Sequence, residues 1–244
     1  MADKSLAKAL KRKMGLDEDI LTGSHLISGD VTLLMNGPRR RIFQHVCNNP
    51  CSHLRDISRK LDMSPQTASW HLSKLSEGKL VAKTVLGKKT LFFPNYGKIG
   101  EGECEVFSLL RRKDVNKVFL FIMKHQEVTQ GSITKSLGIY QQKLSMKLTS
   151  LEKAGLIGYE KKGRKKVYST TNEIQELEKR FLKNFTGFEK WLMDVLTKDG
   201  VNPKITEEDE GKITIILDIG SEEKTHITIN KNPLMALLSN QVRP

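Results

Sequence analysis

The sequence contains an internal repeat in which residues 39–96 align with residues 115–172, without a gap, at a constant offset of 76 positions. Apolar positions correspond along the whole alignment, and the polar turn Gly87-Lys88-Lys89 recurs as Gly163-Arg164-Lys165. A repeat at a fixed offset indicates that one structural unit occurs twice, which constrains the fold more tightly than any single motif. The chain is therefore predicted to contain two copies of one small basic module.

Each copy begins with a pattern that predicts three short helices. In the first copy, apolar residues at helical spacing occupy residues 39–48, and Asn49-Pro50 ends this helix because the residue before a proline disfavours the helical conformation. Ser52 is the predicted N-cap of the second helix. Ser64-Pro65 then opens the third helix, with a capping serine and a proline at the first helical position.

Two strand-like runs, Leu80–Val85 and Thr90–Phe93, follow the third helix and flank a polar turn. This arrangement predicts a β-hairpin. Three helices followed by a basic hairpin form the winged helix-turn-helix. The expected fold class is mainly α with small β-wings (α+β): two tandem winged helix-turn-helix domains, a long C-terminal helix and a small C-terminal β-hairpin piece.

The third helix of each copy is the predicted DNA-reading element, because a helix-turn-helix places its second helix in the major groove. With Ala68, Leu72 and Leu75 facing inward, the outward face carries side chains that hydrogen-bond to bases or phosphates. Neither outward face has an arginine for guanine, so we expect a site rich in A·T pairs. The candidate residues in and beside these two helices are Ser64, Pro65, Gln66, Thr67, Ser69, Trp70, Ser73, Lys74, Gln141, Gln142, Ser145, Met146 and Thr149.

The distribution of charge supports the same prediction. The chain has a formal net charge of +13, and the excess is concentrated in the two copies. Residues 37–96 contain 11 Lys and Arg against 3 Asp and Glu, and residues 110–172 contain 14 against 4. Such a concentration is typical of nucleic-acid binding, although a basic hairpin alone can be a solvated loop. The cationic candidates are Arg39, Arg40, Lys88, Lys89, Lys161, Lys162, Arg164, Lys165 and Lys166.

Two segments resemble the winged-helix regulators of the ArsR/MarR type. In the first copy the resemblance lies in Pro38–Phe43 followed by Ser64–Leu75, and in the second it lies in Leu148–Ile157 leading into the basic wing. It covers roughly residues 30–172 and implies a DNA-binding transcription regulator. Tandem copies in one chain are similar to a group of archaeal regulators that includes activators of archaellum genes in methanogens. Tyr140 departs from the pattern, since it stands where the first copy has its capping serine.

A metal- or thiol-responsive sensor of the ArsR type is the alternative function. Its candidate ligands are His45, Cys47, Cys51 and His53, all of which are side chains that bind zinc. Their spacing matches no known zinc pattern, so we predict no metal and no other cofactor. Cys104 is expected to be a free thiol. Few cysteines, no signal peptide and no apolar run of membrane-spanning length predict a cytoplasmic protein.

The regions outside the modules carry weaker signals. In residues 172–199, apolar positions with near-heptad spacing predict a long helix capped by Asn172, and we expect its apolar seam to join a homodimer. That seam can alternatively cover the core of its own chain. The expected organisation is an N-terminal basic and apolar extension (1–29), the first module (30–96), an acidic spacer (97–109), the second module (110–171), the long helix (172–199) and a C-terminal hairpin and helix (200–244).

No enzymatic motif is present in the sequence. It has no nucleotide-binding glycine loop, no nucleophile elbow and no metalloprotease motif, so we predict a protein that is not an enzyme. Tandem winged helices also serve in protein interaction or RNA binding. A protein-docking module favours an apolar or acidic face on the third helix, whereas this face is polar and neighboured by lysine. The expected partners are promoter DNA in duplex form, a second copy of the chain and possible contacts with the transcription machinery, with no membrane.

Overall fold

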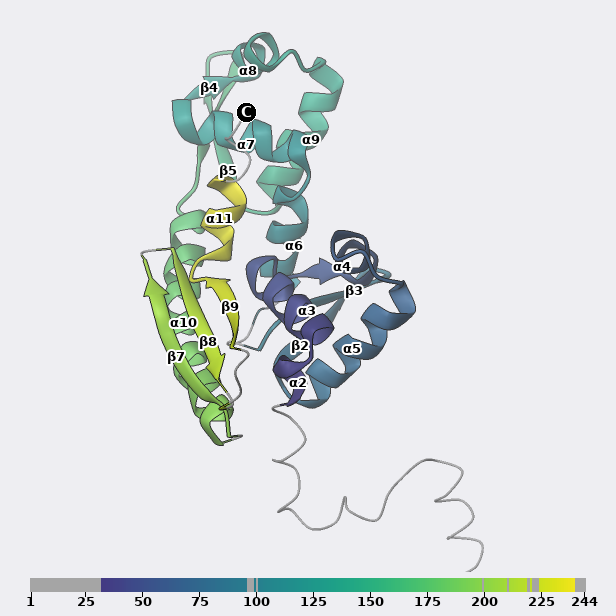
Figure 1. The fold of residues 1–244 in the computed structure, drawn as a ribbon. Helices are drawn as coiled ribbons and strands as arrows, with labels where there is room; N and C mark the ends of the chain where they lie inside the picture. The colour runs from purple at the N-terminus through teal and green to yellow at the C-terminus, as the bar shows by residue number, and fades with distance from the viewer. Residues whose placement is uncertain are drawn as a thin grey trace, which may run out of the picture.

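The computed structural model describes most of the chain beyond the N-terminal segment (Figure 1). The described residues are 32–95, 99, 101–198, 200–209, 211–218, 220 and 224–239. The predicted N-terminal extension, residues 1–29, lies outside the described residues.

The first module has the predicted order of helices and strands. Its elements are α2 (Thr32–Met35), α3 (Gly37–Asn48), β1 (Ser52–His53), α4 (Leu54–Lys60), α5 (Pro65–Glu77), β2 (Val81–Leu86) and β3 (Lys89–Pro94). The strands form an antiparallel sheet in the order β1-β3-β2, so that the β2–β3 hairpin projects as a wing. The core beneath the sheet is formed by apolar residues of α3, α4 and α5, including Ile42, Phe43, Ile57 and Leu72.

The helix starts follow the capping pattern, with one correction. The Ser64 side chain accepts a hydrogen bond from the Thr67 backbone N–H at 3.0 Å, and Pro65 is the first residue of α5, as predicted. The prediction that Ser52 caps α4 is wrong. His53 is the N-cap, and its Nδ1 accepts from the Arg55 backbone N–H, while Ser52 lies in β1. The short strand β1 takes up the residues between the proline turn and α4.

The second module repeats the first at the predicted offset. Its elements are α7 (Lys113–His125), β4 (Val128–Thr129), α8 (Gln130–Leu137), α9 (Gln141–Lys153), β5 (Ile157–Lys162) and β6 (Lys165–Thr170). All three strands and α9 begin and end 76 residues after β1, β2, β3 and α5. The strand order β4-β6-β5 is also the same. The helices and strands predicted from the repeat therefore occur twice along the chain.

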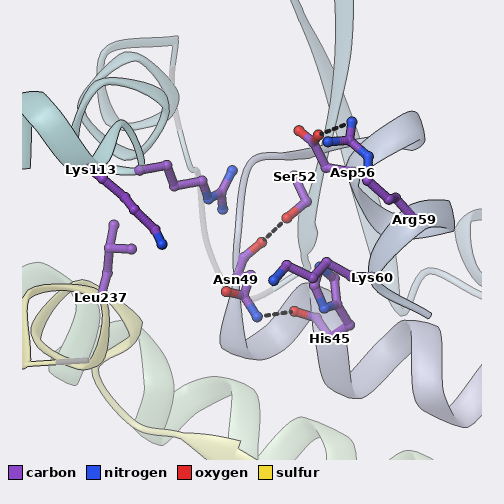
Figure 2. Close-up of a pocket in the computed structure, with 9 residues that line it drawn as sticks. His45, Asn49, Ser52, Asp56, Arg59, Lys60, Lys113 and Leu237 are labelled. Atoms are coloured by element: carbon purple, nitrogen blue, oxygen red, sulfur yellow. Dashed lines mark hydrogen bonds and ion pairs between the residues drawn. The ribbon is translucent and has the colours of Figure 1, made fainter. Parts of the chain in front are cut away.

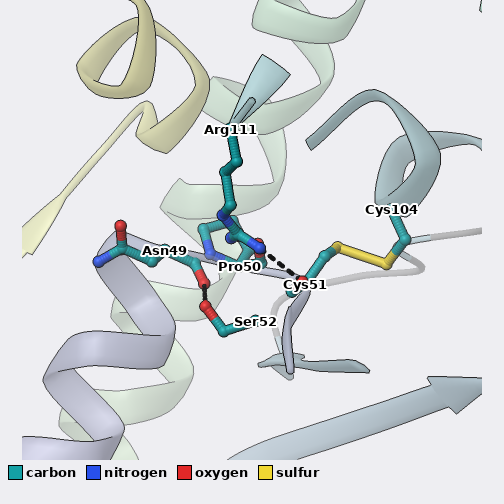
Figure 3. The surroundings of a disulfide bond; sticks show 6 residues. All are labelled: Asn49, Pro50, Cys51, Ser52, Cys104 and Arg111. Atoms are coloured by element: carbon teal, nitrogen blue, oxygen red, sulfur yellow. Dashed lines mark hydrogen bonds between the residues drawn. A yellow bond between two sulfur atoms is a disulfide. The ribbon is translucent and has the colours of Figure 1, made fainter. Parts of the chain in front are cut away.

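The segment expected to be an acidic spacer is instead a helix of the core. Residues Glu101–Leu110 form α6, which buries Cys104, Phe107 and Leu110. Cys104 is bonded to Cys51 in a disulfide, with the two Cα atoms 5.2 Å apart, so the prediction of a free thiol at Cys104 is wrong (Figure 3). The disulfide also removes one reason for the predicted cytoplasmic location, because that prediction assumed that the cysteines are unpaired.

The predicted long helix is present as α10 (Glu173–Lys198), but its apolar seam is already covered. Ile174, Leu177, Phe181, Phe185, Phe188 and Leu192 are all buried within the single chain. The Phe188 ring lies 6.4 Å from the ring of Phe43 in the first module, and the Phe181 ring lies 5.4 Å from that of Phe107 in α6. This corrects the expectation that the seam faces a second protomer. Asn172 stands directly before the helix, as predicted for its cap, and its carbonyl accepts from the Glu176 N–H at 3.0 Å, while the Thr171 hydroxyl accepts from the Glu173 N–H.

The C-terminal piece is a three-stranded sheet rather than a hairpin. Strands β7 (Asn202–Glu208), β8 (Lys212–Asp218) and β9 (Thr225–Asn230) pair antiparallel in that order, and α11 (Pro233–Ser239) follows as predicted. The sheet buries one face, including Ile213, Ile215 and Leu217, because those side chains alternate along β8. In Figure 1 the sheet lies beside α10.

One asparagine joins the C-terminal sheet to the first module. The Asn48 side-chain amide donates to the Thr228 carbonyl at 2.9 Å, and its oxygen accepts from the Asn230 N–H at 2.7 Å. Asn48 thereby acts as an extra hydrogen-bonding partner for the edge of β9, whose backbone groups would otherwise be unpaired there. No helix in the described part of the chain is long and apolar enough to cross a membrane.

We predict that Phe188→Ala lowers the free energy of unfolding by about 3–5 kcal/mol, because the change leaves a cavity between α10 and the first module. Leu182→Ala on the same helix is the matched control. Leu182 is 41% exposed whereas Phe188 is 3% exposed, so the control loses little apolar burial. Urea denaturation followed by circular dichroism measures both values. Equal losses in the two variants would contradict the burial of the seam.

The cysteines predict a defined pattern of alkylation. Burial raises the pKa of the Cys47 thiol well above its usual value, so the native protein should resist iodoacetamide. Unfolding without a reductant should expose that thiol alone, since Cys51 and Cys104 are bonded to each other. Unfolding with a reductant should allow all three cysteines to react. Mass spectrometry counts the adducts, and three adducts without reductant would show that the disulfide is absent.

Candidate nucleic-acid interface

The outward face of α5 is polar and accessible. Ala68, Leu72 and Leu75 are buried, as predicted, whereas Gln66 and Ser69 are exposed. An exposed amide and an exposed hydroxyl on adjacent turns form the kind of surface that hydrogen-bonds to base edges. The helix therefore uses one side to fold and leaves the other for a partner.

Trp70 is the large apolar side chain on this face, and it is 52% exposed. The guanidinium carbon of Arg39, from α3, lies 5.3 Å from the centre of the Trp70 ring, a distance at which a cation and an aromatic face attract each other. The pair places a cation beside the polar face of α5. Arg40, the other predicted cation of α3, is engaged inside the chain, because its Nη1 donates to the carbonyls of Leu34 and Met35.

A carboxylate engages the last two candidates on α5. Glu77 accepts hydrogen bonds from the Lys74 amino group at 2.6 Å and from the Ser73 hydroxyl at 3.2 Å. The Lys74 hydrogen bond lowers the pKa of the Glu77 carboxyl. Contact with a phosphate at this point would have to compete with Glu77, which the sequence-based choice of candidates did not include.

The equivalent face of α9 is also exposed. Gln141, Gln142, Ser145 and Thr149 are accessible, and Met146 is 73% exposed. A methionine this exposed on a polar face is available for contact with thymine methyl groups.

Tyr140 adds an aromatic side chain at the start of α9. It occupies the N-cap position without a side-chain capping bond and is 79% exposed. It was noted in the sequence only as a departure from the capping pattern. Its exposure beside the polar face of α9 makes it a further candidate for contact with DNA.

The second wing carries cations on both of its strands. Lys161 pairs in register with Lys166, and Lys162 pairs with Lys165, on either side of the turn at Gly163. Gly163 has a φ of +64°, which this tight turn requires and which most side chains disfavour. Four amino groups and the exposed Arg164 are therefore gathered at the tip of one hairpin.

Two interactions that spacing did not reveal organise this wing. The Lys162 amino group forms an ion pair with Glu127 at 2.9 Å, and this contact raises the pKa of Lys162. The Lys166 amino group lies 3.7 Å from the centre of the Tyr159 ring. Both cations remain on the surface, but they are held in place by neighbours within the module. In the first wing, Lys88 and Lys89 are exposed as predicted.

The two helices with polar faces lie on the same side of the molecule. In Figure 1, α5 and α9 are both placed away from α10 and the β7–β8–β9 sheet. The parts of the chain that bury the apolar seam are therefore separate from the parts that present polar side chains.

The four candidate metal ligands do not form a site. Cys51 is bonded to Cys104, Cys47 is completely buried, and His53 caps α4 through its Nδ1. Among the described residues, no group of three or more His, Cys, Asp or Glu side chains is arranged to hold a metal ion. His45 and Cys47 lie two residues apart in α3 and therefore point to different sides of the helix.

Comparison with known families gives a match within the first module. Residues 35–81 match the family described as winged helix-turn-helix DNA-binding. An uncharacterized HTH-type transcriptional regulator of Methanocaldococcus jannaschii is 25% identical over 149 residues, which cover 60% of this chain and 37% of that protein. The chain thus spans well under half the length of this relative.

One solved structure is also similar in part. It is the homodimeric winged helix-turn-helix DNA-binding domain, in solution, of a possible ArsR-family transcriptional regulator from Mycobacterium bovis. The match has 18% identity and a TM-score of 0.25, and it covers 46% of this chain and 84% of that domain. A TM-score this low supports no argument about the arrangement or assembly of the present chain.

Proposed function

We propose that the chain is a transcription regulator that binds specific sequences in duplex DNA through two winged helix-turn-helix modules. The observation that carries the proposal is the exposed polar face of α5, which lies in the segment matching the DNA-binding family and recurs at the same offset in α9. A helix-turn-helix reads DNA with this face of this helix. The name of the archaeal relative as a transcriptional regulator agrees with the proposed role.

The two kinds of surface have different tasks in this proposal. Gln66, Ser69 and Trp70 on α5, with Gln142 and Ser145 on α9, contact base edges and select the sequence. Without an arginine on either face, the preferred sites are rich in A·T pairs. The DNA sequence that these side chains prefer determines where on the chromosome the protein binds. A regulator of this kind would act in the cytoplasm, where the chromosome lies.

The second wing provides the sequence-independent part of the affinity. Lys161, Arg164 and Lys165 are exposed at its tip and are the cations proposed to contact phosphates. Lys162 contributes less in this proposal, because Glu127 neutralises part of its charge. Arg40 is not included among the DNA contacts, since its guanidinium is bound to backbone carbonyls of α2.

We predict that Gln66→Ala and Ser69→Ala each reduce the difference in binding free energy between operator and scrambled duplexes, by about 1–3 kcal/mol per lost base contact. Arg164→Gln and Lys165→Gln should weaken binding to both duplexes alike. Each lost phosphate contact should also make the negative slope of log affinity against log salt shallower by about 0.9. Fluorescence anisotropy with labelled duplexes, the operator being identified first by selection from a random library, measures these values.

Lys198→Gln, at the end of α10 and outside both modules, is the control and should leave affinity and slope nearly unchanged. Single-stranded DNA and duplex RNA of the same sequence are the competitors that distinguish a duplex-DNA regulator from an RNA-binding module. Equal affinity for operator and scrambled DNA in the unchanged protein would contradict the proposed specificity.

We also propose that the regulator acts as a homodimer, because two-fold symmetric proteins match the symmetric half-sites of many operators. The buried seam of α10 is not the proposed contact surface. Multi-angle light scattering of the whole protein should give twice the mass of one chain at micromolar concentration. The mass of a single chain, with or without operator DNA, would show that one chain with its two modules is the functional unit.

A further inference from the structure

A pocket of about 390 Å³ lies where the two modules meet the C-terminal helix (Figure 2). Its walls come from the end of α3, from α4, from the connection between α6 and α7, and from Leu237 of α11. The pocket is separate from the outward faces of α5 and α9 and from both wings. Its volume is within the range that holds small molecules in proteins.

The side chains around this pocket are predominantly basic. Asp56 is the one carboxylate of the lining, and it is paired with Arg59 at 3.3 Å. Lys60 and Lys113 also line the pocket, and within the described residues neither has an ion-pair partner. Figure 2 shows their amino groups directed toward the same space from opposite sides. Two ammonium groups therefore face a common cavity whose one lining carboxylate, Asp56, is paired with Arg59.

A third cation, Arg111, is fixed in position by the backbone. Its guanidinium donates to the carbonyls of Pro50 and Cys51, next to the disulfide (Figure 3). Burial lowers the pKa of Arg111 to about 10, so the group remains charged at neutral pH. Because both terminal nitrogens of this guanidinium donate to carbonyls, Arg111 contributes a fixed positive charge at the pocket rather than a free fork of donors.

The neighbouring histidine responds to the same positive environment. Burial, together with the positive charges of Arg111 and Lys60, lowers the pKa of His45 to about 4. At neutral pH the imidazole is uncharged, so it has one N–H donor to offer a ligand. The Asn49 amide donates to the His45 carbonyl at 3.2 Å and holds this end of α3 in place.

We propose that this pocket is a binding site for a phosphate-type anion, held by Lys60, Arg111 and Lys113. Two lysines without an ion-pair partner and the fixed charge of Arg111 match a ligand with several anionic oxygens, such as a phosphate ester or a diphosphate. Lys60 belongs to the first module and Lys113 to the second, so the bound anion bridges the two modules and fixes their relative position. This site does not depend on DNA binding by the modules.

The test is isothermal titration of the whole protein with pyrophosphate, in a phosphate-free buffer with sodium chloride matched for ionic strength. We expect one saturable site per chain. Lys60→Gln and Lys113→Gln should each weaken binding about tenfold or more, because each removes a charge-assisted hydrogen bond. Lys117→Gln is the matched control, since Lys117 is exposed on the same helix as Lys113 and does not line the pocket.

The variants avoid Arg111, whose contacts with the Pro50 and Cys51 carbonyls also support the fold. A second readout is the imidazole resonance of His45 in NMR spectra, which should shift with the same midpoint as the heat signal. The proposal is overturned if pyrophosphate shows no saturable binding. It is also overturned if Lys117→Gln, or Lys162→Gln in the second wing, weakens binding as much as the pocket variants.

DNA-binding assays of the same variants identify the source of the anion. Unchanged operator affinity in Lys60→Gln and Lys113→Gln supports a free small molecule as the ligand. A loss of operator affinity equal to that of Arg164→Gln, together with competition between pyrophosphate and DNA, supports a phosphate of the DNA backbone. If the protein binds pyrophosphate but no specific DNA, the regulator proposal fails while the pocket proposal stands.

Discussion

The arrangement of the chain depends on the burial of the α10 seam against both the first module and α6. Phenylalanines account for the main contacts, with Phe188 beside Phe43 and Phe181 beside Phe107. Large aromatic side chains bury more apolar area than other residues and have restricted geometries of contact, so these pairs fix how α10 lies on the first module and on α6. The seam is therefore used within the chain. The polar faces of α5 and α9 remain on the side that α10 does not cover.

The positive charge of the chain serves more than one purpose once the side chains are placed. Arg40 binds backbone carbonyls, Lys162 pairs with Glu127, and Arg111 holds the turn that carries the disulfide. A count of basic residues cannot separate such cations from those at the tip of the second wing. The separation depends on which carbonyls and carboxylates lie within about 3–4 Å, because the attraction of an exposed pair weakens quickly with distance in water.

The junction between the modules combines a disulfide, a buried arginine and a basic pocket. Cys51 and Cys104 link the turn before β1 to α6, and Arg111 follows α6 directly. The junction is therefore held more rigidly than a flexible spacer would allow. A rigid junction gives α5 and α9 a defined separation, and the proposed anion between Lys60 and Lys113 would contact both modules at this junction.

The sequence alone determined the modules, because their signals are local. Helical spacing, the Ser64-Pro65 start of α5 and the repeat offset depend on residues close together in the chain, and the structure has both modules at the predicted positions. The tertiary structure decided what covers each apolar surface. The α10 seam had to be buried by something, but its periodicity does not say whether a second chain or its own core covers it. The helix in place of the spacer and the partner of Cys104 were missed because each is stabilised by residues far away in sequence, and a pattern along the chain contains no record of them. Strand β7 was missed for another reason: it pairs with the next strand, β8, but its side chains are mostly exposed and give no alternating apolar pattern.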